Sequence, residues 1–137
     1  MLLTTKGRYA VMAMTEISLS SSGKPLPLAV IAAKQAIDLR YLEQIFCKLR
    51  HANLVRSVKG PGGGYVLNKN LKDINIAEII LAVGENTKMT RCNGASGCMP
   101  MGAKCLTHDL WAALDKNITN FLGSISLADV VSKELGL

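Results

Sequence analysis

The sequence of 137 residues has no uncharged apolar run close to the roughly 18 residues that a membrane-spanning helix needs. Its first residues also lack the long apolar stretch of a secretory signal peptide. No amphipathic stretch is dense in lysine, as a membrane-surface helix would be. We therefore expect a cytoplasmic protein without a membrane partner. Hydrophobic residues make up 49% of the chain and charged residues 19%, which is enough apolar material for a packed core and excludes global disorder.

The signatures of common catalytic sites are absent as well. The sequence has no Cys-x-x-Cys pair, no carboxylate pair with a nearby histidine and no cofactor fingerprint. Its glycine-rich segment at residues 60–64 lacks the Lys-Ser/Thr ending of a nucleotide-binding P-loop. These absences argue against a redox or iron-sulfur enzyme, and we expect a protein that is not an enzyme.

Acidic residues are scarce in the first half of the chain. Residues 1–72 contain eleven Lys and Arg and three Asp and Glu, whereas residues 73–137 contain five and seven. The net charge of +6 therefore comes from the N-terminal half. A basic half joined to a mildly acidic half predicts that the first half binds a polyanion, and nucleic acid is the leading candidate.

Apolar periodicity predicts three helices and then a two-stranded ribbon. We expect a first helix over about residues 4–20, a short second helix after Pro27 and a third helix capped by Asp38. The buried stripe of the third helix is predicted to be Leu39, Leu42, Phe46 and Leu49. Residues 54–58 alternate with a period of two, and residues 65–67 return as a second strand after the glycine-rich turn. This order is typical of a winged helix-turn-helix.

The second half is expected to hold a metal-binding loop between two helices. The periodicity predicts a helix over residues 73–83, a loop over residues 84–104, a long helix from Cys105 to about Leu122 and a terminal piece over residues 127–135.

The expected fold class is mostly α with a small β-ribbon. It consists of a winged helix-turn-helix domain with a following helix (1–83), a metal-binding loop (84–104) and a dimerisation helix with a C-terminal segment (105–137).

The third helix and the ribbon supply the candidate DNA contacts. Side chains suited to base edges gather at the start of the third helix, namely Arg40, Tyr41, Glu43 and Gln44. Glu43 is the candidate selector, since an acid on a basic face accepts from the cytosine amine. The ribbon tip offers Lys59 and Gly60, and further phosphate contacts are expected from Arg8, Lys48 and Arg50. The alternatives, a solvated helix face and a plain hairpin turn, stay open at this point.

Three of the four cysteines lie close together. Cys92, Cys98 and Cys105 are followed by His108, and a residue pair three apart at the start of a helix shares one face. Three thiolates and an imidazole suit structural zinc and equally a [2Fe-2S] cluster. The five residues between Cys92 and Cys98 and the six between Cys98 and Cys105 are wide gaps for zinc ligands, and they favour the larger [2Fe-2S] cluster. Disulfide bonds between these cysteines are the weaker interpretation. Cys47 stands apart on the third helix.

An apolar stripe follows the last long helix at steps of three and four residues. Such a stripe is often part of a chain's own core. Here the preceding elements already make a closed domain, so the stripe predicts a homodimer that binds a palindromic site on double-stranded DNA. Its members are Trp111, Leu114, Ile118, Phe121 and Ile125.

Nearly the whole chain resembles the Rrf2 family of bacterial winged-helix transcription factors. The resemblance rests on four motifs: Leu-Thr-Thr-Lys-Gly-Arg-Tyr-Ala at 3–10, Tyr-Leu-Glu-Gln at 41–44, the glycine tip at 60–65, and the Arg-Cys of 91–92 together with Cys-Leu-Thr-His-Asp-Leu-Trp at 105–111. The histidine of the last motif matches the members that regulate iron-sulfur cluster assembly.

The resemblance implies a homodimer with one [2Fe-2S] cluster per subunit, held here by Cys92, Cys98, Cys105 and His108. It further implies a sequence-specific regulator, mainly a repressor, of genes for cluster assembly. Zinc in the same four-ligand site is the alternative cofactor.

Some positions depart from the family pattern. Ala36 stands where a turn glycine is usual, Asp38 and Arg40 stand where serine is common, and Lys59 replaces an arginine of the ribbon tip. The gap between the second and third cysteines is one residue longer than usual. We expect ligation to survive this insertion, whereas the base preference of the family transfers less safely, because Lys59 lacks the planar fork of arginine.

Overall fold

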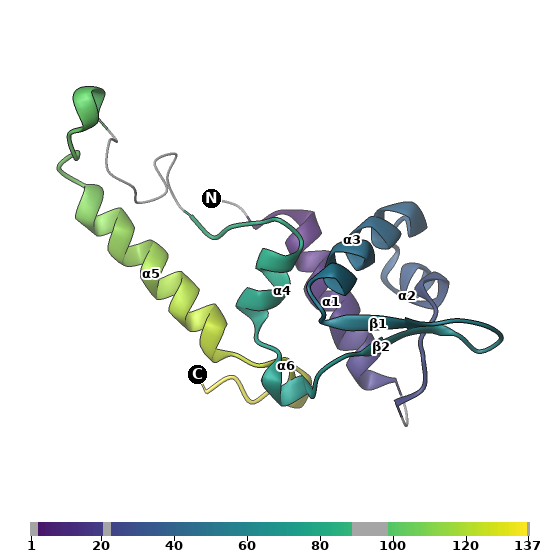
Figure 1. Cartoon of the computed structure of the whole chain (residues 1–137). Helices are drawn as coiled ribbons and strands as arrows, with labels where there is room; N and C mark the ends of the chain where they lie inside the picture. Colours follow the sequence, from purple (N-terminus) through teal and green to yellow (C-terminus); the bar gives the residue numbers. More distant parts are fainter. Residues whose placement is uncertain (1–2, 21–22, 89–98, 137) are drawn as a thin grey trace.

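The computed structural model describes residues 3–20, 23–88 and 99–136 (Figure 1). The first described elements are the helices α1 (Thr5–Leu19), α2 (Leu28–Gln35) and α3 (Leu39–His51), and the strands β1 (Val55–Val58) and β2 (Gly64–Leu67). The later ones are the 3-10 turn η2 (Leu71–Asp73), helix α4 (Ile76–Ala82), the 3-10 turn η3 (Pro100–Gly102), and helices α5 (His108–Ser124) and α6 (Leu127–Ser132). The expected fold, mostly α with a small β-ribbon, is confirmed.

Helix α1 lies at the centre of the core and packs against α3, α4, α6 and β2. Met14 of α1, Phe46 of α3 and Ile80 of α4 are almost fully buried in one apolar cluster. The predicted stripe of α3 is buried at Leu42, Phe46 and Leu49. The first residue of the predicted stripe differs, since Leu39 starts the helix at the edge of the core and is 39% exposed. Ile45, which the prediction did not include, is buried.

Two helix starts differ from the predicted boundaries. Helix α4 begins at Ile76 because Asn75 and Glu78 form a capping box, in which the Asn75 side chain accepts from the Glu78 amide. Asp73, the predicted start, belongs to η2. Helix α5 begins at His108 with Thr107 as its N-cap, so Cys105 precedes the helix and does not lie in its first turn.

The C-terminal segment is built into the core of the N-terminal half. The Leu127 amide donates to the Ile74 carbonyl at 2.7 Å, and the Ile76 amide donates to the Ile125 carbonyl at 3.0 Å. Helix α6 starts with its own capping box, in which the Ser126 amide donates to the Asp129 carboxylate at 2.9 Å and the Ser126 hydroxyl accepts from the Asp129 amide at 3.1 Å. Hydrogen bonding with the Ser126 backbone and side chain lowers the pKa of the Asp129 carboxyl. The core thus runs across the expected boundary at residue 105.

Ile125 is a correction to the predicted dimerisation stripe. It caps the C-terminus of α5 and is buried in the core of its own chain. The apolar stripe on α5 therefore ends at Phe121, because the chain turns into the core after Ser124.

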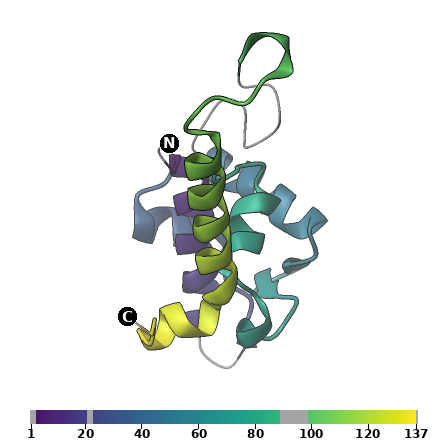
Figure 2. The ribbon, with the colours of Figure 1, turned by 90° about the vertical axis from the view of Figure 1, so that its left-hand side faces the viewer.

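Helix α5 packs against α4 along one side of the molecule, and its His108 end projects beyond the other helices (Figures 1 and 2). The side chains of Trp111, Leu114 and Ile118 are half-buried, whereas those of Leu110 and Phe121 are 59% and 48% exposed. Leu110 joins the exposed apolar face although the predicted stripe did not include it. Within the described residues, no helix is long and apolar enough to cross a membrane.

Candidate nucleic-acid interface and metal site

Helices α2 and α3 form a helix-turn-helix with a three-residue turn. Ala36 ends α2 in the left-handed region, with φ of 54°, and its amide bonds back to Ala32. Ile37 is buried beneath the turn. The Asp38 side chain then accepts a hydrogen bond of 3.1 Å from the Tyr41 amide, which confirms Asp38 as the N-cap of α3.

The outward face of α3 presents most of the predicted base-contacting side chains. Arg40, Glu43 and Gln44 are exposed on it, and Lys48 and Arg50 follow in the later turns. Tyr41 is half-buried, and its ring meets that of Tyr9 edge-on, with 6.0 Å between centroids. The Tyr9 ring thus fixes Tyr41 beside the exposed face of α3.

The two strands form an antiparallel hairpin whose register runs from Val55 opposite Leu67 to Val58 opposite Gly64. Gly60 and Gly62 in its tip adopt φ of 94° and 73°, which side chains disfavour, and the Gly63 amide donates to the Gly60 carbonyl at 2.9 Å. Lys59 and Gly60 are exposed at this tip. The tip therefore presents the exposed backbone of Gly60 and Gly62 next to the Lys59 cation.

The hairpin is fixed relative to α3. Tyr65 and Leu26 exchange both backbone hydrogen bonds, at 2.9 and 3.0 Å, and a Cβ atom at Gly64 would collide with the Leu26 backbone. The Tyr65 ring also packs on Phe46 of α3, with 4.8 Å between centroids. A helix and a ribbon held together in this way form a winged helix-turn-helix, which docks a helix in the major groove.

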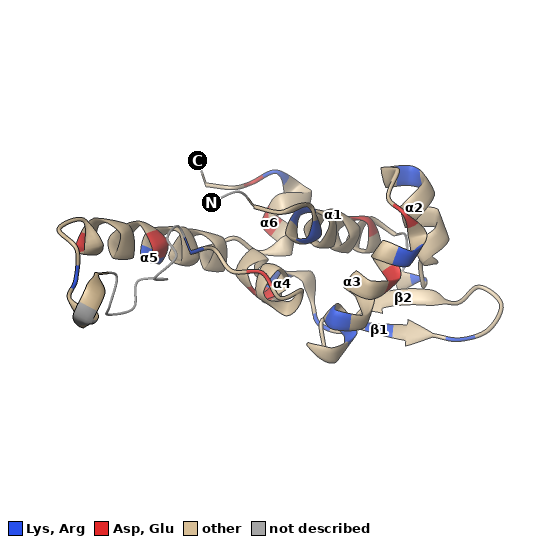
Figure 3. Cartoon of the chain, turned by 90° about the horizontal axis from the view of Figure 1, so that it is seen from above, with Lys and Arg blue, Asp and Glu red and all other residues tan. Residues whose placement is uncertain are grey.

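Basic side chains follow this surface. Figure 3 shows Lys and Arg on α3 and along the hairpin, and acidic residues on α3 and on α5. Arg8 is exposed on α1, the helix whose N-terminus borders α3. The charge asymmetry of the sequence thus becomes a basic face around α3 and the hairpin, which suits a phosphate backbone.

The predicted metal ligands are partly placed. Cys92 and Cys98 lie outside the described residues, while Cys105 and His108 lie at the N-terminal end of α5. The His108 amide donates to the Cys105 carbonyl at 3.1 Å, so one tight turn joins the two residues. His108 is 6% exposed and Cys105 is half-buried.

The donor set fits both cofactors under consideration. Within the described residues, no group of three or more metal-binding side chains comes together. The turn at Cys105 does bring a soft thiol and an imidazole to one end of α5, and two further cysteines precede it in the sequence. Three thiolates and an imidazole are a known ligand type for zinc and for iron-sulfur clusters.

Thr107 orders this turn further. Its hydroxyl accepts a hydrogen bond of 3.1 Å from the Trp111 indole, and the Cys105 Sγ atom lies 3.6 Å from the same hydroxyl. Trp111 was predicted for a dimer interface, and its indole also contributes to the order of the candidate metal site.

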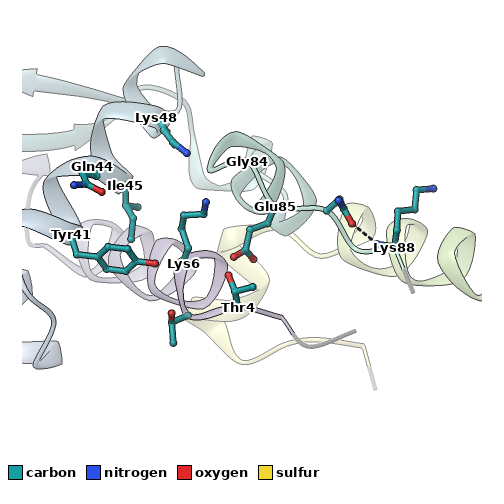
Figure 4. Close-up of a pocket in the computed structure, with 11 residues that line it drawn as sticks. Thr4, Lys6, Tyr41, Gln44, Ile45, Lys48, Gly84, Glu85 and Lys88 are labelled. Atoms are coloured by element: carbon teal, nitrogen blue, oxygen red, sulfur yellow. Dashed lines mark hydrogen bonds between the residues drawn. The ribbon is translucent and has the colours of Figure 1, made fainter. Parts of the chain in front are cut away.

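A cavity of about 700 Å³ beside α3 was not foreseen from the sequence (Figure 4). It is lined by the N-terminus of α1, by one side of α3 and by residues 84–88, which follow α4. Glu85 lines it with a buried carboxylate. No pattern in the sequence marks Glu85, because its burial results from the packing of three separate elements.

The comparisons with known proteins agree with this geometry. The family model of Rrf2, described as an iron-dependent transcriptional regulator, matches residues 3–133. The chain is 52% identical over 134 residues to the HTH-type transcriptional regulator IscR of Photorhabdus laumondii, covering 98% of this chain and 81% of that protein. It is 50% identical to IscR of Escherichia coli, with 98% and 82% covered.

Solved structures of transcriptional regulators also have the same fold as this chain. "T. potens IscR" superposes with a TM-score of 0.79 and 33% identity, covering 97% of this chain and 88% of that one. The cysteine regulator CymR of B. subtilis superposes with a TM-score of 0.82 and 28% identity, covering 97% and 98%.

Fold and surface together define a winged-helix DNA-binding transcriptional regulator. Within that class, the chain belongs to the Rrf2 family, as its sequence motifs predicted. The relatives are named as regulators of transcription and not as enzymes, in agreement with the expectation that this chain is not an enzyme.

Proposed function

We propose that this chain is a homodimeric regulator whose DNA binding depends on a [2Fe-2S] cluster in each subunit. Cys92, Cys98, Cys105 and His108 would hold the cluster. The genes under its control would be those for iron-sulfur cluster assembly, mainly through repression. The curated relatives that support this proposal carry the name IscR.

The observation that carries the proposal is the turn at the N-terminal end of α5. It joins Cys105 to His108 at the end of a helix that exposes the apolar side chains of Leu110 and Phe121. A second copy that covers Leu110 and Phe121 would place two metal sites and two α3 helices about one two-fold axis. Such symmetry matches a palindromic operator.

A cluster would supply a redox-active and oxygen-sensitive group with a histidine ligand, and histidine ligation alters potential and response to pH. The residues of this chain would supply the turn that orients the donors. Structural zinc in the same site is the second candidate, supported by the Cys3His donor set.

Visible absorption of anaerobically purified protein separates the two cofactors. We expect bands from the near ultraviolet to the red, with two irons and two acid-labile sulfides per subunit. A colourless protein with one zinc per subunit would leave the DNA-binding module and remove the sensor.

DNA binding is tested on the same sample by selection from a randomised duplex library and by fluorescence anisotropy on the selected site. We expect a palindromic site whose affinity changes when the cluster is removed. Equal affinity of the cluster-bound and cluster-free forms at every selected site would contradict the sensing part of the proposal.

A further inference from the structure

The segment that leaves α4 lies against α3 before it leads towards Cys92. The carbonyl oxygen of Val83, the C-cap of α4, accepts a hydrogen bond of 3.5 Å from the Lys48 ammonium group. A Cβ atom at Gly84 would lie 3.5 Å from the same Nζ atom. Lys48, which we expect to contact DNA, is thus also in contact with the start of the predicted metal loop.

Glu85 adds a negative charge to the same place. Its side chain is 9% exposed, and neither carboxylate oxygen has a hydrogen-bond partner among the described residues. The carboxylate lies against Gly7 of α1, where a Cβ atom would overlap Oε2. Burial of a carboxylate without a partner is strongly unfavourable, so a nearby cation stabilises it.

The candidate sources of such a cation are the lysine side chains that line the same cavity, which are Lys6, Lys48 and Lys88. Lys6 of α1 and Lys48 of α3 line it together with Glu85 (Figure 4). Neither lysine forms an ion pair within the part of the chain that the structure describes. Both are therefore available to a phosphate on one side and to the Glu85 carboxylate on the other.

We propose that Val83 and Glu85 compete with DNA phosphates for the Lys48 ammonium group, so that the position of residues 83–88 sets how strongly α3 binds DNA. This inference rests on the proposed DNA-binding function. An ammonium group that points into the cavity neutralises Glu85, and one that points outward neutralises a phosphate. Residues 84–88 are the first part of the predicted metal loop (84–104), so the competition would couple a change in that loop to DNA binding by α3.

A double-mutant cycle tests the competition in metal-free protein. The measured quantity is the Kd for a fluorescent 30-base-pair duplex, at two salt concentrations. Glu85→Gln keeps the shape of the side chain and removes its charge, and we expect it to tighten binding about fivefold or more. Lys48→Met should weaken binding by a similar factor. In the Lys48→Met background, Glu85→Gln should change Kd by less than about twofold.

Glu134→Gln is the matched control, since it removes the same charge from an exposed residue near the C-terminus, away from the cavity. Equal effects of Glu85→Gln and Glu134→Gln would overturn the competition, as would additive effects of Glu85→Gln and Lys48→Met. Thermal melting of each variant checks that the chain is folded.

Hydrogen exchange gives a readout without DNA. If Lys48 holds the segment, Lys48→Met speeds amide exchange at residues 84–88 at least about threefold and leaves exchange in α1 unchanged. Unchanged exchange at residues 84–88 would overturn the proposal. A wild-type chain that binds no duplex would refute the DNA-binding function and the competition together, whereas normal affinity with additive effects overturns the competition alone.

Discussion

Ala36 adopts a backbone conformation that residues with a side chain disfavour. Its φ of 54° ends α2 and starts the turn to α3, at a position where the family pattern has glycine. Left-handed backbone costs a non-glycine residue about 1 kcal/mol or more, and glycine avoids that cost. The left-handed backbone at position 36 thus explains why the family pattern has glycine there, where this chain has alanine.

Ala36→Gly is therefore expected to stabilise the fold by about 0.5 to 1 kcal/mol, measured as the free energy of unfolding in urea. Ala33→Gly, in the exposed middle of α2, is the control and should destabilise the fold by about 1 kcal/mol. Destabilisation by both substitutions would show that the turn does not strain Ala36.

Glu43 is exposed on α3, near Arg40. As an acid on a basic face it would cost affinity for phosphate, and we propose that it would reject wrong bases. Glu43→Ala is expected to broaden the set of sequences recovered from a randomised duplex library, with a discrimination loss of about 1 to 3 kcal/mol at one base pair. Glu134→Ala serves as the control, and unchanged selectivity of Glu43→Ala would refute the selector role.

Helix α3 owes its start to a local cap and its orientation to tertiary contacts. Asp38 supplies the cap at 3.1 Å from the Tyr41 amide, while Phe46 and Tyr65 join the helix to the hairpin. By contrast, Thr4 occupies the N-cap position of α1 without a side-chain hydrogen bond. A capping residue type therefore marks where each of these two helices begins, but it does not tell whether the side chain makes the capping hydrogen bond.

Removal of the cap in Asp38→Ala is expected to lower the free energy of unfolding by about 1 kcal/mol, because the Tyr41 amide loses its acceptor. Asp38→Asn keeps an acceptor and should stay within a few tenths of a kcal/mol of the wild type. Chemical denaturation measures both. Equal losses in the two variants would mean that the charge of Asp38 matters more than its cap.

At the scale of the whole molecule, α5 joins the candidate metal site to an exposed apolar face. Its N-terminal end carries His108, and its exposed side carries Leu110 and Phe121. An exposed apolar helix face of this kind is typical of an interface. The two proposed properties, metal binding and dimerisation, therefore share one helix, and Trp111 is predicted to contribute to both.

Cys92→Ala and Cys105→Ala are expected to abolish the cluster and leave a folded dimer, since the apolar core that the described residues form is built mainly from α1, α2, α3 and α4 and does not include Cys105. Absorption spectra, iron analysis and light scattering check this outcome. Cys47→Ala is the matched control and should keep full iron content, because Cys47 lies on α3. Loss of folding in the first two variants would indicate a structural metal.

The dimer has its own test. Leu110→Asp and Phe121→Asp place charge on the exposed face and should each raise the dimer dissociation constant about thirtyfold or more, measured by analytical ultracentrifugation. Around the helix axis, Lys116 points about a third of a full rotation away from the direction of Leu110 and Phe121. Lys116→Asp therefore serves as the control. Dimers of wild-type strength in the first two variants would place the interface elsewhere.

The sequence by itself determined the order of helices and strands, the winged helix-turn-helix, the cap at Asp38 and the basic N-terminal half, because periodicity, capping and charge are local properties. It also determined the family, through motifs spread over the chain.

Tertiary structure alone decided that Ile125 belongs to the core, that Leu110 is exposed and that Glu85 is buried in a cavity that Lys48 also lines. Each of these depends on contacts between elements far apart in the chain, and no local pattern encodes which of two apolar faces meets the core.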